Sequence, residues 1–401
     1  MKKLSFYALW LCMATSLSAH AQETTVVDGS SVFGDLTARQ IGPALMSGRV
    51  NDLEIHPTNN KIVYLGAGGG GVWKSNDGGA TFIPIFDDYI QSIGTVTLDP
   101  NDPDKTIYVG TGETWTRNSV SYGNGLYKTT DGGSNWQKIG LENSERIASI
   151  VVNPENSNEI YVAAMGALWG DNEERGVFKS MDGGQTWEKV LYVNPRTGCA
   201  DLLMDPRNPS VLYASMWEFR RTGWSFDSGG ENSALYKSID GGKTWDKIHN
   251  GFPSGKLGRM GIAIAKSNPD VLYTVIEAEQ KKDKGLYRSN DLGASWEQMN
   301  NDFEITVRPF YFSRLVVDPR NENVIYKGGL RGSVSKDGGK TFKGLGNMHS
   351  DVHDMVFSNM HSDIMFFATD GGVYRSWNGG TTCEIVENLP LSQFYQISVD
   401  N

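Results

Sequence analysis

The 401-residue chain carries 37 Lys and Arg against 47 Asp and Glu, which gives a formal net charge of −10. This acidic balance argues against nucleic acid or an anionic membrane as a partner, because both are themselves negative. The 47 glycines, 11 Trp, 16 Tyr and 16 Phe favour short strands joined by tight turns over helices.

The first 21 residues predict a secretory signal peptide. Lys2 and Lys3 precede an apolar run over residues 4–17, which is too short to span a bilayer comfortably. Residues 19–21 (Ala-His-Ala) then place small side chains where a signal peptidase cleaves. We therefore expect cleavage before Gln22, a net charge of −12 for the remaining chain, and an exported protein, periplasmic or extracellular, without membrane insertion.

An eight-residue motif then recurs seven times along the chain. A Ser or Thr is followed two positions later by Asp, then by glycines, and in most copies by an aromatic residue, as in residues 180–187. The anchor residues are Asp77, Asp131, Asp182, Asp240, Asp291, Asp337 and, in a degenerate seventh copy, Asn378. Their spacing of 41 to 58 residues is the length of one four-stranded blade. The repeat predicts an all-β chain folded as a seven-bladed β-propeller of antiparallel blades.

Each blade has a common frame upstream of its motif. A β-rich segment ends in a Pro turn and a second strand begins near a Tyr, as from Pro57 to Tyr64. Proline cannot donate to a strand ladder, so it marks the turn between the first two strands. We read each blade as strand A, Pro turn, strand B, a variable loop, strand C, the motif turn and strand D.

The motif resembles the Asp-box, the bacterial neuraminidase repeat. The order of motifs, with residues 42–50 and 308–313, is similar to the sortilin-type propeller proteins of bacteria, often labelled glycosyl hydrolases. The resemblance implies further blades or a second propeller beyond Asn401. We therefore divide the chain into a signal peptide (1–21), a lead segment (22–42), a propeller (43–390) and the start of a further blade or propeller (391–401).

We interpret the seven Asp-boxes as structural. An Asp in a tight turn accepts backbone N–H bonds, paired glycines supply positive φ, and the aromatic residue packs under the hairpin. The copies would also be spread around the ring, so they could not converge on one site.

The functional face is predicted from propeller geometry, since the D–A and B–C connections share one face. Charged residues gather at or near the starts of the A strands, together with one Tyr: Arg49, Asp52, Arg146, Asp201, Arg259, Arg308, Tyr311, Arg314, Asp351 and Asp354. A dry core would not place so many charges there, whereas a solvated axial channel would. In such a channel they either pair with one another or bind a ligand.

The B–C loops differ from blade to blade and carry tryptophans close to carboxylates and arginines. The four are Trp115, Trp169, Trp217 and Trp224. An aromatic ring beside charged groups suits a sugar, with the ring stacking on C–H faces and the charges bonding hydroxyls. The alternative is that these tryptophans only cap the blades.

Two classes of function remain. The first is a glycan-binding or glycoside-hydrolysing protein, in which Asp52, Asp201, Asp351 and Asp354 are the candidate catalytic carboxylates, with Glu113 and Glu218 of the B–C loops as further candidates. Its ligand-binding residues would be the four tryptophans with Arg49, Arg146, Arg259, Arg308, Tyr311 and Arg314. The second is a non-enzymatic, sortilin-like receptor or scaffold that holds a peptide in its axial tunnel.

We expect no cofactor and no metal. Residues 66–71 match a dinucleotide-binding pattern formally, but a strand follows them where a helix would be required. His349 and His353 are close in sequence, but zinc usually takes three or more protein ligands. Cys199 and Cys383 could form a disulfide in an oxidising compartment, although two cysteines do not demand one.

Overall fold

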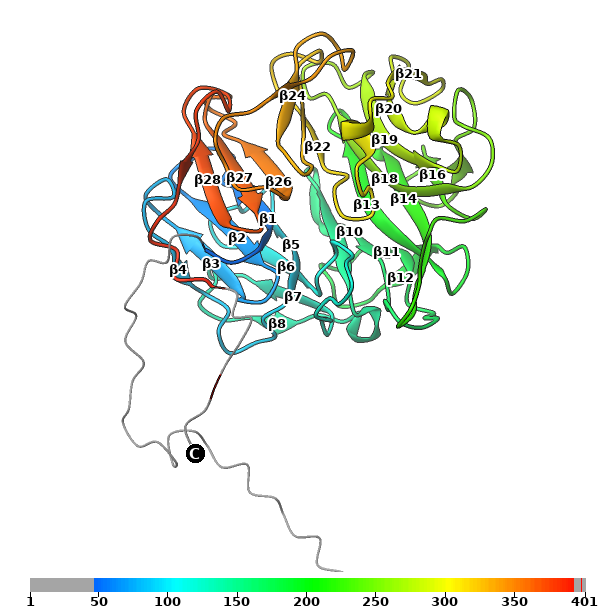
Figure 1. Ribbon diagram of the computed structural model, residues 1–401. Coiled ribbons are helices and arrows are strands. Elements are labelled where there is room, and N and C mark those ends of the chain that lie inside the picture. Colours follow the sequence, from blue (N-terminus) through cyan, green and yellow to red (C-terminus); the bar gives the residue numbers. More distant parts are fainter. Residues whose placement is uncertain (1–46, 393–397, 399–401) are drawn as a thin grey trace, which may run out of the picture. The chain divides into compact units, whose positions relative to one another are not determined.

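The computed structural model describes residues 47–392 and residue 398. This part folds into seven antiparallel sheets arranged in chain order around an axis, which confirms the predicted seven-bladed β-propeller (Figure 1). The predicted signal peptide, the whole lead segment, residues 43–46 and residues 393–397 and 399–401 lie outside the described residues. Among the described residues, no helix has the length and apolar character needed to cross a bilayer.

In each of the first four blades, the chain forms the innermost strand first and the outermost strand last. Blade 1 contains β1 (Val50–Ile55), β2 (Val63–Ala67), β3 (Val72–Ser75) and β4 (Ile83–Pro84). Blade 2 contains β5 (Ile93–Leu98), β6 (Ile107–Thr111), β7 (Leu126–Thr129) and β8 (Gln137–Lys138). Blade 3 contains β9 (Ile147–Asn153), β10 (Asn156–Ala164), β11 (Gly176–Ser180) and β12 (Glu188–Leu191). Blade 4 contains β13 (Thr197–Asp205), β14 (Asn208–Arg221), β16 (Ala234–Ser238) and β17 (Asp246–Lys247), and β15 (Phe226–Ser228) pairs with the extended end of β14.

The last three blades follow the same order. Blade 5 contains β18 (Leu257–Ile264), β19 (Leu272–Ala278), β20 (Gly285–Ser289) and β21 (Glu297–Asn300). Blade 6 contains β22 (Leu315–Val317), β23 (Ile325–Lys327), β24 (Ser333–Ser335) and β25 (Lys343–Gly344). Blade 7 contains β26 (Val352–Phe357), β27 (Met365–Thr369), β28 (Gly372–Ser376) and β29 (Glu384–Ile385). Single 3₁₀ turns η1 (Glu142–Ser144), η2 (Lys281–Asp283) and η3 (Phe303–Thr306) lie in the connections.

Every Asp-box forms the turn between the third and fourth strands of its blade. In the first box the Ser75 hydroxyl donates to Asp77 Oδ1 (2.8 Å), and the N–H of Thr81 donates to the same oxygen (2.8 Å). The Thr81 hydroxyl donates to Asp77 Oδ2 (2.6 Å), so both carboxylate oxygens are used inside the turn. Gly78 and Gly79 adopt φ of 73° and 80°, which a glycine reaches without the Cβ clash of other residues. The box contacts thus match the structural interpretation.

Neighbouring blades are tied together through these same turns. A cationic side chain on the third strand donates to the backbone carbonyl of the residue that follows the anchor Asp in the next blade. The bonds are Lys74 to Gly132, Lys128 to Gly183, Lys179 to Gly241, Lys237 to Leu292 and, from blade 7 back to blade 1, Arg375 to Gly78, at 2.7 to 3.4 Å. The last bond helps to close the ring between its final and first blades.

Apolar packing between blades forms the core and also closes the ring. Phe366 and Ala368 of β27 pack with Leu53, Leu65 and other buried residues of blade 1. Leu389 and Leu391, which follow β29, join this cluster, and the Ser47 hydroxyl donates to the carbonyl of Leu391 (2.8 Å). Cys199 and Cys383 are both free thiols.

Candidate functional site

The two ends of the propeller axis differ in what surrounds them. The loops between second and third strands lie beside the starts of the inner strands. In blade 1, for example, the N–H of Gly68 donates to the Arg49 carbonyl (3.0 Å). We call this side the loop face. The Asp-box turns and Pro turns lie on the opposite side, which we call the turn face.

Four of the predicted charged residues lie together on the axis. Arg314, directly before β22, reaches across the channel to Asp354 of β26 (Nε to Oδ1, 2.9 Å) and Asp52 of β1 (Nη2 to Oδ1, 3.4 Å). Its charge also acts on Asp201 of β13. We call Asp52, Asp201, Arg314 and Asp354 the axial ring. Burial raises the pKa of all three carboxyl groups, and the charge of Asp354 raises that of Asp52 further.

The carboxylates of the axial ring also bond to the backbone of the next blade. Asp354 accepts the N–H of Leu53 (2.9 Å), and Asp52 accepts the N–H of Val96 (2.7 Å). Asp201 accepts the N–H of Ile262 (3.2 Å). A β-bulge directly precedes each of these acids in its own strand and so sets the direction of its side chain. These bonds assign the ring the role of joining inner strands around the axis.

An aromatic layer covers the axial ring on the side of the loop face. Trp115, from the loop between β6 and β7, is 5% exposed and packs with Tyr311 and Phe312, which are still more deeply buried. The Arg314 guanidinium lies 5.7 Å from the Trp115 ring centre and that of Arg259 lies 4.3 Å from it. We call Trp115, Tyr311 and Phe312 the axial plug. The charges expected in a solvated channel are therefore paired with one another beneath this layer.

A second group of charged residues surrounds the plug on the loop face. Asp370, between β27 and β28, accepts bonds from Arg49 Nε (2.6 Å), His353 Nε2 (2.7 Å) and the Tyr311 hydroxyl (3.1 Å). Arg49 also bonds Glu113 (2.9 Å), which bonds Arg117 (3.2 Å). The bonds from His353 and Arg49 hold the pKa of Asp370 well below its usual range, although burial opposes them. The loop-face cluster comprises these residues and Asp351.

Asp351 is the member of the cluster with the opposite electrostatic character. Burial and the neighbouring Asp370 charge raise its pKa, so it retains a proton more readily than an exposed Asp. Its backbone adopts φ of 64°, in the left-handed region that costs energy for a residue with a Cβ. Asp351 Oδ1 and His353 Nδ1 are buried without a hydrogen-bond partner within the part of the chain that the structure describes. The cluster therefore holds a carboxylic acid beside a stabilised carboxylate.

A small hollow gives access to this cluster. It encloses about 120 Å³ and is lined by Arg49, Arg117 and Ser121 with glycines of the blade 1 loop, and by Leu391 and Ser392. Two guanidinium groups that already bond carboxylates therefore also line a space that a ligand could enter.

The other predicted arginines have different surroundings. Arg146 is 1% exposed and donates to the Gly166 carbonyl (2.8 Å) and the Thr116 hydroxyl (3.2 Å). Arg259 is 2% exposed and donates to the carbonyls of Thr114 and Phe310, both at 2.9 Å. Both therefore hold loops against the plug. Arg308 is exposed, with its guanidinium 5.0 Å from the Tyr311 ring centre.

The four predicted tryptophans separate into two buried and two exposed residues. Trp115 belongs to the plug, and Trp217 is fully buried against Phe219 and Phe226. Trp169 is 51% exposed and Trp224 is 90% exposed, on the loops of blades 3 and 4. Only the last two can meet a ligand at the surface without rearrangement.

The exposed aromatic residues stand on loops that brace one another. Arg220 bonds Asp171 and donates to the Trp169 carbonyl (3.2 Å), which joins the loops of blades 3 and 4. Arg221 donates to Asn118 Oδ1 (2.5 Å), which joins the blade 4 loop to that of blade 2, where Tyr122 is 69% exposed. We call the three loops that carry Trp169, Trp224 and Tyr122 the aromatic loops. The blade 2 loop also supplies Glu113 and Arg117, so the loop-face cluster and the aromatic loops share one segment.

Asp370 is the residue of the cluster that sequence reasoning missed. It occupies a two-residue connection, Asp370-Gly371, which reads as an ordinary tight turn. Its position between the second and third strands of blade 7 was the available signal, because the corresponding loops of other blades supplied candidates.

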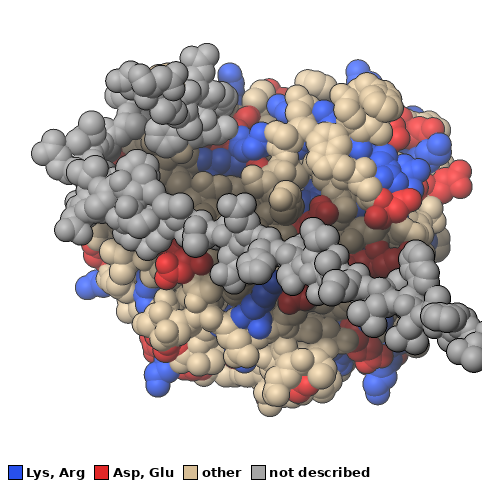
Figure 2. Space-filling model, turned by 90° about the horizontal axis from the view of Figure 1, so that it is seen from below, with Lys and Arg blue, Asp and Glu red and all other residues tan. Residues whose placement is uncertain are grey.

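On the face visible in Figure 2, acidic and basic side chains are interspersed, without a broad field of one sign.

Comparison with known proteins finds a sortilin family model and xyloglucanases that are similar to parts of this chain. The family model described as Sortilin, neurotensin receptor 3 (Sortilin-Vps10) matches residues 124–285. A xyloglucanase of a Paenibacillus species is 24% identical and covers 85% of this chain and 35% of its own length. The xyloglucanase Xgh74A of Acetivibrio thermocellus is also 24% identical and covers 72% and 37%. The chain thus spans about a third of the length of these curated relatives.

Solved structures show the same fold. The GH74 xyloglucanase of Xanthomonas campestris superposes with a TM-score of 0.62 at 16% identity, over 86% of this chain and 54% of that one. YCF48 bound to D1 peptide superposes with a TM-score of 0.55 at 16% identity, over 86% of this chain and 99% of that one. The chain is therefore an Asp-box β-propeller with sortilin-type and glycosyl-hydrolase-type relatives.

Proposed function

We propose that the loop face binds a glycan of the xyloglucan type. The observation that carries this proposal is the position of Trp169, Trp224 and Tyr122, three exposed aromatic side chains on the loops of adjacent blades. Large aromatic residues on a braced surface offer rings that stack on sugar C–H faces, while neighbouring arginines and carboxylates bond hydroxyl groups.

The xyloglucanase relatives support the choice of ligand. Their similarity extends over most of this chain, although it covers only part of their own length. We therefore take the glycan class from them as a proposal and place its binding on the face that carries Trp169, Trp224 and Tyr122. With the leader-like residues 1–21, the relatives also support our proposal that the protein acts outside the cytoplasm.

We propose the loop-face cluster as the place where hydrolysis would occur. Glycoside hydrolysis divides its work between a carboxyl group that keeps a proton and a carboxylate that stays ionised. Asp351 has the raised pKa that suits a proton donor, and Asp370 beside it has the lowered one. Four donor atoms hold the Asp370 oxygens, so we assign Asp370 as the carboxylate that stays ionised beside Asp351. Asp52, Asp201 and Asp354 lie beneath the plug, so we assign them no contact with the polymer.

A peptide-binding function is the second candidate. The structural similarity to YCF48 bound to D1 peptide covers nearly all of that chain, whereas the xyloglucanase structure is covered only in part. The axial plug blocks entry to the channel from the loop face, so a peptide on this side would have to lie across the aromatic loops.

Affinity electrophoresis of the full chain through gels containing xyloglucan tests the proposal. We expect retardation that the double variant Trp169→Ala, Trp224→Ala loses, with a fall in affinity of at least about tenfold, because both rings are removed. Trp377→Ala is the matched control, since Trp377 is 54% exposed but lies in the Asp-box of blade 7 on the turn face. If Trp377→Ala reduced retardation as strongly as the double variant does, the assignment to the loop face would be refuted. If xyloglucan did not retard the parent protein, the peptide candidate would be favoured.

Release of reducing sugar from the bound polymer tests hydrolysis separately. We expect Asp351→Asn to abolish release while leaving retardation unchanged, because Asp351 lies in the cluster and not on the aromatic loops. Loss of retardation together with release would mean that Asp351 acts in binding.

A further inference from the structure

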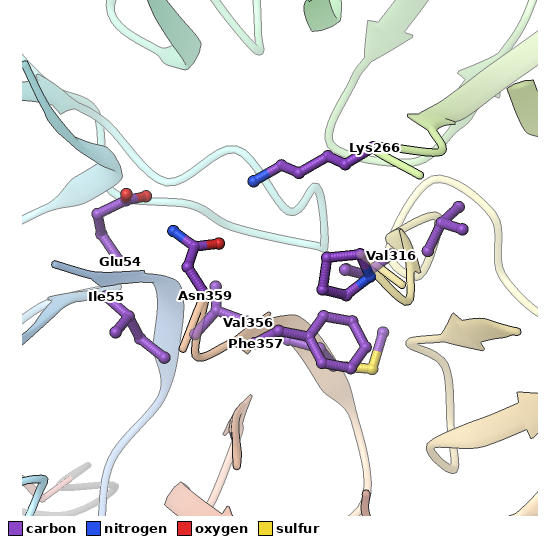
Figure 3. Close-up of a pocket in the computed structure, with 10 residues that line it drawn as sticks. Glu54, Ile55, Lys266, Val316, Val356, Phe357 and Asn359 are labelled. Carbon is purple, nitrogen blue, oxygen red and sulfur yellow. The ribbon is translucent and has the colours of Figure 1, made fainter. Parts of the chain in front are cut away.

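The turn-face mouth of the axis contains a hollow that the glycan proposal does not use. It encloses about 160 Å³ and lies among the inner strands and Pro turns of blades 1, 5, 6 and 7 (Figure 3). Its apolar wall includes Val316 and Pro319 of blade 6 and Val356 and Phe357 of blade 7, all only half-buried. Its polar groups are Glu54 at the end of β1, Lys266 after β18 and Asn359 after β26.

Glu54 interrupts an otherwise mostly apolar layer of the channel. The corresponding inner-strand positions in the other six blades are Thr97, Val151, Leu203, Ala263, Val316 and Val356. A carboxyl group placed among such neighbours loses hydration, which costs free energy unless a partner replaces the water. Burial accordingly raises the pKa of Glu54 to about 8.

Within the described residues, neither Glu54 nor Lys266 forms an ion pair or a side-chain hydrogen bond. The two groups nevertheless affect one another, because the charge of Lys266 opposes the rise in the Glu54 pKa. Figure 3 shows the Lys266 ammonium extending over the hollow toward the side that carries Glu54 and the Asn359 amide. A carboxyl group and an ammonium therefore face one space across a gap that they do not close themselves.

We propose that this hollow binds a small zwitterion with an apolar body, of the chemistry of an aliphatic α-amino acid. Its ammonium would bond Glu54, its carboxylate would bond Lys266, and its side chain would contact Val316, Val356 and Phe357. Charge-assisted bonds of this kind are stronger than neutral ones, so Glu54 would release its proton on binding and both groups would gain the partner they lack. The size agrees, because a cavity of about 150 Å³ accommodates a molecule as large as benzene.

Titration calorimetry on the full chain, with three related ligands, measures how much each of the two charge contacts contributes to affinity. We expect L-leucine to bind saturably, and L-leucinamide and N-acetyl-L-leucine to bind at least about tenfold more weakly, since each lacks one charge. Equal binding of the three, or no binding of leucine, would overturn the proposal.

Two variants assign the contacts. We expect Glu54→Gln to remove the preference for leucine over N-acetyl-leucine, and Lys266→Met to remove the preference over leucinamide. Glu155→Gln and Lys105→Met are matched controls, because both residues are exposed on Pro turns of other blades. Leucine affinity that survives Glu54→Gln unchanged in a variant with an unaltered melting temperature would refute the site. Loss of xyloglucan binding would leave this result untouched, because the aromatic loops lie on the other face.

Discussion

The turn face and the loop face of this propeller differ in how far apart in the sequence their hydrogen-bond partners lie. On the turn face each Asp-box satisfies its own polar groups within a few residues, as Asp77 does with Ser75 and Thr81. On the loop face and along the axis, the partners come from distant parts of the chain, as Arg49 does with Asp370, 321 positions away. Substitutions on the turn face should therefore have small, local effects, whereas substitutions at the axis should affect the whole ring.

The largest effect is expected at the centre of the axial ring. Arg314→Met removes the cation that Asp52 and Asp354 share and leaves buried carboxylates uncompensated, which should reduce the free energy of unfolding by about 3–5 kcal/mol. Urea denaturation checks this. The loss should be greater at pH 8 than at pH 5. Burial raises the pKa of Asp52 and Asp354 in the folded protein above the unfolded value of 3.8. The free-energy cost of ionising these buried acids is therefore absent below pH 3.8 and grows as the pH rises toward their folded-state pKa.

Arg320→Met is the control for this change. Arg320 belongs to the same blade and pairs with Asp318 and Asp363, but its own side chain is 62% exposed to water. Its replacement should change stability by less than about 0.5 kcal/mol. A similar loss for both variants would mean that the axis is no more critical than the surface.

A smaller effect is expected for one Asp-box. Asp77→Ala should destabilise the fold by about 1 kcal/mol, since the turn loses its bonds to Thr81 while water still reaches the site. Bonds from Thr81 lower the Asp77 pKa to about 2, so this stability is present above 3.8 and is lost as pH falls toward 2. Urea denaturation at pH 7 and pH 3 should show the difference between variant and parent shrinking at the lower pH.

Asp77→Asn is the companion variant. In blade 7, Asn378 already occupies the anchor position, where its Oδ1 accepts the N–H of Thr382 (2.9 Å) and its Nδ2 donates to the Thr382 hydroxyl (2.9 Å). We therefore expect Asp77→Asn to be milder than Asp77→Ala, and both to leave xyloglucan retardation unchanged. Loss of retardation in either would refute the structural interpretation of the boxes.

The smallest effect concerns the one box with an irregular turn. Leu292 stands where each of the six other boxes has its first glycine, and its φ of 58° is unfavourable for a residue with a Cβ. Leu292→Gly should raise the free energy of unfolding by about 0.5 kcal/mol, because relief of the clash slightly exceeds the entropic cost of glycine. Thermal denaturation checks the sign, and Gly241→Leu in the neighbouring box should shift the melting temperature downward.

The same difference explains what the sequence could predict. Blade number, strand order and the Asp-box turns follow from patterns within eight residues or repeated along the chain, so they were predicted in full. Asp52, Arg314 and Asp354 were predicted at the axis, but their pairing depends on three blades meeting, which no local pattern encodes. The plug over them depends on which way Trp115 turns, and the sequence could not show that it faces inward.

Two further residues show the limits of reading loops from sequence. Trp217 belongs to the same blade 4 insertion as Trp224, yet it is fully buried while Trp224 is 90% exposed. The period of β14 continues through Trp217, which makes it a strand residue and not a loop residue. Tyr311 was placed at the start of an inner strand, but β22 begins at Leu315, because the preceding segment folds over the axis as part of the plug.

Hydrogen–deuterium exchange of the full chain with and without a xyloglucan oligosaccharide tests the central claim most directly. Bound glycan should slow exchange in the loops around residues 115–122, 168–175 and 219–230, and leave the seven Asp-box turns unchanged. Protection confined to the Asp-box turns, or equal protection of both faces, would contradict the assignment of glycan binding to the loop face.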